Sequence, residues 1–163
     1  MTYAIPGRRR GLRAASAVGA VSLGLLALSA CEKPTPLTTV TVGDTTVTTE
    51  AACYEDGDKL AQKKFGKCLE KKAEESITVE AGEKIRFGVE PAMAETGWML
   101  FVNGQPVLPE PVDQTYRSFP GDAFFQQQGG AGGGEPQKTQ VSVVETKDGD
   151  VYGVWHLRIE RAG

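Results

Sequence analysis

Hydrophobic and polar residues alternate through the last part of the chain with the two-residue period of β-strands. Val141 and Val143 share one face of a predicted strand over 140–145, and the turn 147–150 leads into a second strand. In that second strand one face carries Gly153, Trp155, Leu157 and Ile159, and the other carries Tyr152, Val154, His156, Arg158 and Glu160. The pattern predicts an antiparallel hairpin of two strands joined by this turn.

The beginning of the chain's polar body contains a second predicted hairpin. Two runs of threonine and valine, 38–42 and 45–49, flank the pair Gly43-Asp44. β-branched residues favour strands, and a glycine–aspartate pair between two such runs is typical of a tight turn. We therefore expect these two runs to pair with each other.

Two further segments continue the β pattern. Alternating residues over 77–80 and 84–89 surround the turn 81–83, which predicts a two-stranded unit with one buried face. The dense run 98–102 suits a central strand, and it ends at Asn103-Gly104, a strong hairpin signal.

About seven short strands separated by turns predict a mainly β fold, an immunoglobulin-like β-sandwich over residues 38–163. Trp98 would be the aromatic residue at the centre of its core. The chain departs from true immunoglobulin domains because no cysteine lies in the later strands, so the disulfide between the two sheets is missing.

An insert over 53–75 interrupts the strands. Its two cysteines, Cys53 and Cys68, form an even pair once Cys31 is set aside, which predicts a disulfide in an exported protein. Within the insert we expect a short helix that Asp58 caps and that runs through Phe65 to a stop at Gly66. A second helical piece is expected from Cys68 to Glu75.

The N-terminal 30 residues have the organisation of a secretory signal. Four arginines precede an uncharged stretch over 14–30, and small residues come directly before Cys31. The tetrapeptide that ends at Cys31 resembles the bacterial lipobox, in which the cysteine receives a diacylglyceryl group. The alternatives are an uncleaved membrane helix and a signal without lipid. The polar segment 31–37 would be a short tether.

Charge separates the signal from the body of the protein. Residues 1–30 hold four of the 18 basic residues and none of the 21 acidic ones, so the remainder has a net charge of −7, against −3 for the whole chain. An acidic body argues against nucleic acid as a partner and against charge-driven adhesion to anionic lipid.

Catalytic and metal-binding chemistry is sparse. His156 is the single histidine, and no phosphate-binding loop, dinucleotide motif or cysteine cluster is present. We therefore expect no catalytic residue, no metal ion and no cofactor. Carboxylates are numerous and scattered, so an unrecognised envelope hydrolase stays an alternative.

The aromatic segment 116–125 is the candidate contact patch. Its members are Tyr116, Arg117, Phe119, Phe124 and Phe125. One interpretation is that the phenylalanines plug the open end of the sandwich. The other is that Tyr116, Arg117 and some of the rings contact a partner, because such residues are enriched at interface cores. The glycine- and glutamine-rich stretch 126–137 is expected to be a flexible loop.

Several motifs resemble a family of small actinobacterial lipoproteins of unknown function. They are Cys31-x-Lys-Pro-Thr-Pro-Leu-x-Thr-Val-Thr-Val, Glu50-Ala51-Ala52-Cys53-Tyr54, Arg86-Phe87-Gly88-Val89, Gly97-Trp98, Tyr116-Arg117-Ser118 with Pro120-Gly121, and Tyr152-Gly153 before Trp155. The resemblance implies a single-domain lipoprotein, with no known activity attached.

Together these observations lead to one main expectation of function. The chain would be held by lipid on Cys31 at the extracytoplasmic face of the cell membrane, and its domain would bind an extracytoplasmic protein or envelope component without catalysis. An accessory or structural subunit of a membrane complex is the alternative that differs least from it.

Overall fold

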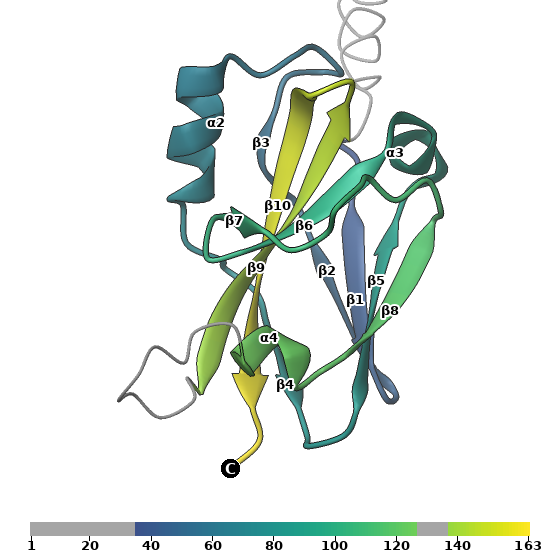
Figure 1. Ribbon diagram of the computed structural model, residues 1–163, viewed down its shortest axis with the longest axis vertical. Coiled ribbons are helices and arrows are strands. Elements are labelled where there is room, and N and C mark those ends of the chain that lie inside the picture. The colour runs from purple at the N-terminus through teal and green to yellow at the C-terminus, as the bar shows by residue number, and fades with distance from the viewer. Residues whose placement is uncertain (1–34, 127–136) are drawn as a thin grey trace, which may run out of the picture. The chain divides into compact units, whose positions relative to one another are not determined.

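The computed structural model describes residues 35–126 and 137–163, which lie in one compact unit that spans Thr35–Gly163 (Figure 1). The predicted signal, Cys31 and most of the predicted loop 126–137 lie outside the described residues. In chain order the elements are β1 (Thr38–Val42), β2 (Thr45–Thr49), β3 (Ala51–Tyr54), α2 (Gln62–Leu69), β4 (Ser76–Val79), β5 (Lys84–Val89), α3 (Pro91–Thr96), β6 (Trp98–Val102), β7 (Gln105–Pro106), β8 (Tyr116–Pro120), α4 (Ala123–Gln126), β9 (Lys138–Lys147) and β10 (Asp150–Arg161).

The strands form two sheets. The smaller sheet has the order β2-β1-β5-β8, and all its neighbours are antiparallel. The larger sheet has the order β3-β10-β9-β6-β7, and β4 pairs in parallel with the last residues of β10. One hydrophobic cluster contains residues of both sheets. The expectation of a mainly β sandwich is confirmed at this level.

The two strongest hairpin predictions are also confirmed. β1 pairs with β2 from Thr38↔Thr49 to Val42↔Thr45, as the runs around Gly43-Asp44 indicate. β9 pairs with β10, and both strands extend beyond the predicted bounds. The face of β10 that carries Trp155, Leu157 and Ile159 is buried in the core.

Trp155 explains why a glycine lies on that face. A Cβ atom at Gly153 would come within 2.3 Å of the Trp155 ring, so only glycine leaves room for it. The ring nitrogen of Trp155 donates a 2.7 Å hydrogen bond to the carbonyl of Pro36. The N–H of Leu37 donates to the Glu90 carboxylate at 2.9 Å. The last residues of the predicted tether are therefore bound to the domain.

The predicted pairing of the strands around the turn 81–83 is wrong. Both strands exist with the expected buried residues, but β4 lies beside β10 in the larger sheet and β5 lies between β1 and β8 in the smaller one. The turn therefore crosses from one sheet to the other. Alternation identifies the buried face of a strand but carries no information about its neighbour.

The predicted helices of the insert are shifted. The helix runs from Gln62 to Leu69, through Gly66, and no side chain caps its start. No helix follows it over 70–75. The position follows from burial, because Phe65, Cys68 and Leu69 are spaced at i, i+3 and i+4 and face a second hydrophobic cluster on the outer side of the larger sheet.

Candidate interaction surface

The predicted Cys53–Cys68 disulfide is present and holds the insert against the larger sheet. The two Cα atoms lie 6.0 Å apart, and Cys53 lies on β3 while Cys68 lies in α2. Val144 and Val154 pack beneath the insert, and the rings of Phe65 and Phe101 meet edge to face with centroids 5.9 Å apart. The insert therefore covers part of the outer face of the larger sheet.

His156 lies under the same cover. Its Nδ1 atom is 2.8 Å from the Ser142 hydroxyl, and its Nε2 atom is 2.8 Å from the carbonyl oxygen of Cys68. A carbonyl only accepts, so Nε2 carries the proton and Nδ1 accepts from the serine. Burial lowers the pKa of His156, although the hydrogen bond to Cys68 acts in the opposite direction. The histidine therefore joins the sheet to the insert as a neutral group.

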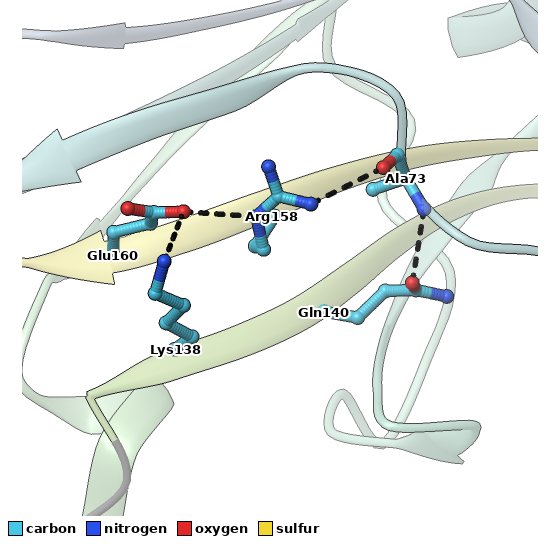
Figure 2. Close-up of polar contacts among 5 residues, drawn as sticks. All are labelled: Ala73, Lys138, Gln140, Arg158 and Glu160. Carbon is cyan, nitrogen blue, oxygen red and sulfur yellow. Dashed lines mark hydrogen bonds and ion pairs between the residues drawn. The ribbon is translucent and has the colours of Figure 1, made fainter.

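A polar clamp continues this cover beyond the helix (Figure 2). Gln140 accepts from the Ala73 N–H at 3.1 Å. The Gln140 amide also donates to the Lys71 carbonyl at 2.8 Å. Arg158 donates to the Ala73 carbonyl at 3.4 Å and to Glu160 at 2.9 Å. The irregular segment after α2 is thus fastened to β9 and β10.

A polar groove of about 740 Å³ lies between this fastened segment and the β2–β3 connection. Its lining is Thr48, Thr49, Glu50, Ala51, Ala52, Lys71, Lys72, Glu74, Glu75 and His156. The Lys71 ammonium donates to the Ala52 carbonyl across it. The His156 imidazole, which also lines the groove, already has two hydrogen-bond partners, Ser142 and the carbonyl of Cys68.

Glu145 is the carboxyl in the described residues whose pKa is raised, and burial is the main cause. It pairs with Trp98 on β6 and with Gly153 on β10, and its Oε2 atom has no partner within the described structure. Glu145 does not line the groove, so the carboxyl with the raised pKa and the groove are separate features. Over residues 35–126 and 137–163, no three histidine, cysteine or acidic residues are placed to hold a metal ion.

The structure divides the candidate contact patch into two parts. Phe124 and Phe125 lie in α4 and are 4% and 0% exposed, so they belong to the core, as the plug interpretation expects. Phe119 is half-buried and packs against Phe87 and Phe124, with ring centroids 5.9 and 6.0 Å away. Tyr116 is 59% exposed and Arg117 is exposed, and both lie on β8.

β8 is the edge strand of the smaller sheet, and β5 is its one neighbour there. Tyr116 and Ser118 face outward beside Arg86, because Arg86 is the residue paired with Ser118. The Arg86 guanidinium lies 5.6 Å from the centroid of the Tyr116 ring. On the other face of β8, the Arg117 guanidinium lies 5.5 Å from the Phe119 ring. Two arginines therefore stack on aromatic rings at this edge.

The outer face of the smaller sheet is rich in hydroxyl groups and has no acidic member on its strands. The residues that alternation places there are Thr39, Thr41, Thr46, Thr48, Lys84, Arg86, Gly88, Tyr116, Ser118 and Pro120. Thr41 and Thr46 share a 2.9 Å hydrogen bond. A Cβ at Gly88 would lie 2.6 Å from the Thr39 hydroxyl, so the glycine keeps this face flat beside Tyr116.

The arginines of the described residues show how unusual this edge is. Arg158 is paired with Glu160 at 2.9 Å and Arg161 with Asp122 at 3.8 Å. Within the described part of the chain no carboxylate lies within ion-pair distance of Arg86 or Arg117. Sequence reasoning selected Arg117 but missed Arg86. Alternation places Arg86 on a polar strand face, but its neighbour across the sheet comes from a segment about 30 residues away.

No protein-family model, curated protein or solved structure matches this chain. Within residues 35–126 and 137–163, no helix has the length and apolar character needed to cross a bilayer.

Proposed function

We propose that this chain is an extracytoplasmic lipoprotein, anchored in the membrane by lipid on Cys31, and that its sandwich is a non-catalytic binding module. Its partner would be an extracytoplasmic protein or another envelope component. The contact surface would be the β8 edge, with Tyr116, Arg117 and the neighbouring Arg86. We also propose that the fold is immunoglobulin-like and that the chain is a member of the small actinobacterial lipoproteins that its motifs resemble.

The observation that carries the binding role is the exposed Tyr116 ring, with the Arg86 guanidinium over it and without a carboxylate in ion-pair distance. Tyrosine and arginine are among the residues that are enriched at the energetic centre of protein interfaces. Leu37 is the other large hydrophobic residue of the described chain that is exposed, at 38%. The disulfide supports export, because such bonds persist in oxidising compartments.

The anchor is tested by detergent phase partition of the full chain. Wild type should enter the detergent phase, since two acyl chains bind a membrane firmly, and Cys31→Ala should stay largely in the aqueous phase. The matched control is the double variant Cys53→Ala with Cys68→Ala, which also loses cysteine residues, here those of the disulfide, but keeps Cys31. Equal partition of wild type and Cys31→Ala would contradict the lipid anchor.

The contact surface is tested by capture from solubilised envelope membranes with the full chain immobilised. Tyr116→Ala with Arg117→Ala should reduce capture about tenfold or more, the effect of losing an interface anchor. The control, Lys63→Gln with Lys67→Gln, removes two exposed cations from α2 instead. If both variants capture as well as wild type, the β8 edge is not the contact surface.

A further inference from the structure

The free edge of β8 offers backbone hydrogen-bonding groups as well as side chains. The N–H of Val89 donates to the carbonyl of Thr115 at 2.8 Å, and that of Gly121 donates to Glu83 at 2.8 Å, so residues 115 and 121 point toward β5. In an antiparallel ladder, alternate residues direct both backbone groups to the same side. Arg117 and Phe119 therefore bond to β5, and Tyr116 and Ser118 direct their N–H and C=O groups away from the sheet.

No strand of the described residues pairs with that side of β8. An edge with unpaired backbone groups is a template for another strand unless the protein protects it. β8 ends at Pro120, which limits the edge to the segment around Tyr116 and Ser118. The template is thus short and has a defined register.

Charge determines which strand this template accepts. Arg117 and Arg86 flank the edge on opposite faces, and Lys84 continues the positive charge on the outer face. Two β8 edges side by side would bring the arginines of both copies together, and like charges across strands are unfavourable. An acidic strand would gain ion pairs instead, so the charge disfavours a second copy and favours an acidic partner.

We propose that β8 receives an acidic, extended peptide segment of a partner as an additional strand of the smaller sheet. The inference deepens the proposed function and rests on it for the identity of the domain as a binding module. Tyr116 and Ser118 form the backbone hydrogen bonds, and Arg117 faces a carboxylate directly across the new strand pair. The Arg86 guanidinium, held over the Tyr116 ring, meets a second carboxylate on the outer face. Backbone bonds supply affinity and the arginines supply selectivity, as in other strand-addition complexes.

The test uses two fluorescent synthetic peptides and the full chain in detergent. One peptide alternates valine and threonine with glutamate, and the other has lysine in place of each glutamate. Fluorescence anisotropy should show at least tenfold tighter binding of the glutamate peptide at low salt, with a difference that shrinks as salt screens the charges. In hydrogen exchange, that peptide should slow the amides of Tyr116 and Ser118.

The decisive variant is Ser118→Pro. It removes an N–H that points to the open edge, so pairing with β5 is kept, and proline is tolerated at this kind of position. Binding should weaken about tenfold, because one backbone donor is lost and the proline ring occupies the edge. Ser118→Ala keeps the N–H and should bind as wild type does. Arg117→Gln should reduce the preference for the glutamate peptide and leave the unfolding transition unchanged.

Three results would overturn strand addition. One is equal binding of both peptides, or no binding of either. Another is tight binding by Ser118→Pro with loss in Tyr116→Ala, which would indicate a ligand on the flat face, such as a glycan. The last is a dimer in sedimentation that Ser118→Pro dissociates, which would make a second copy the occupant. If envelope capture depends on Tyr116 and Arg117 but not on Ser118→Pro, the contact surface stands and strand addition fails.

Discussion

The outer faces of the two sheets differ, because one is covered and the other is open. On the larger sheet the face is covered by the disulfide-linked insert, His156 is buried with two partners, and Arg158 is paired with Glu160. On the smaller sheet the face is open, and its arginine lies over an exposed tyrosine. The comparison shows where this chain uses its polar residues for structure and where it leaves them available.

The difference comes from what each face would expose without its cover. Val144 and Val154 of the larger sheet are fully buried beneath the insert, whereas the outer face of the smaller sheet carries threonine, lysine, arginine and glycine. Apolar area removed from water stabilises by about 25 cal/mol per Å². The first face therefore requires a cover and the second does not, which leaves the second for contacts with other molecules.

The largest expected effect comes from placing a charge on the outer face of each sheet. Val154→Asp puts a carboxylate beneath the insert and should lower the free energy of unfolding by more than about 4 kcal/mol, because buried charge without a partner is costly. Ser118→Asp puts the same group on the open face and should change stability by about 0.5 kcal/mol or less. Urea unfolding measures both, and equal losses would mean that the faces do not differ.

The disulfide tests how strongly the cover is attached. Replacing Cys53 and Cys68 by alanine should cost about 3 kcal/mol for a closed loop of this size, and the reported range for small exported domains reaches 5. In the wild-type protein, alkylation before reduction should find no free thiol, and alkylation after reduction should find two, those of Cys53 and Cys68. A loss well below 1 kcal/mol would show that the insert contributes little to stability and that the face beneath it tolerates water.

How far the sequence predicts this molecule depends on the distance between interacting residues. The β1–β2 and β9–β10 hairpins follow from local alternation and turn residues, and alternation also gives the residues that share a face of β10 with Trp155. The disulfide follows from cysteine parity. Each of these features involves residues that are close in the chain or have no alternative partner.

Features that depend on distant neighbours were not accessible in this way. The turn 81–83 resembles a hairpin, but the insert brings β4 to the edge of β10, so the chain crosses between sheets. The helix begins later than Asp58 because Cys68 has to face Cys53. For the site, Tyr116 and Arg117 follow from residue type, but the contact between Arg86 and Tyr116 joins two strands that are distant in the sequence.

The pH dependence of stability tests the buried histidine. The pKa of His156 is lowered in the folded protein, so the unfolded chain binds its proton first as the pH falls. The stability from the neutral ring is complete above the unfolded pKa of about 6.5 and is lost as the pH falls through the folded pKa. Glutamine does not titrate, so His156→Gln lacks this pH dependence. The difference in the free energy of unfolding between wild type and variant should therefore shrink below pH 6.5. A constant difference would mean that the ring is accessible to water.

The last prediction concerns the smallest effect, the exchange of single backbone amides in the unmutated protein. If β8 has an open edge, its amides should exchange with deuterium in an alternating pattern in the free protein. Tyr116 and Ser118, which point away from β5, should exchange rapidly, whereas Arg117 and Phe119, which bond to β5, should be protected. Phe125, buried in α4, should exchange slowly because opening it disrupts the core. On the covered side, Val154 has strand partners on both sides, β3 and β9, and should be protected together with its neighbours.

Uniform protection across residues 116–119 would show that something already occupies the edge, and uniformly fast exchange would show that β8 is not a stable strand. Only alternating fast and slow exchange fits an edge strand that is ordered and unpaired. That state can accept a strand from a partner.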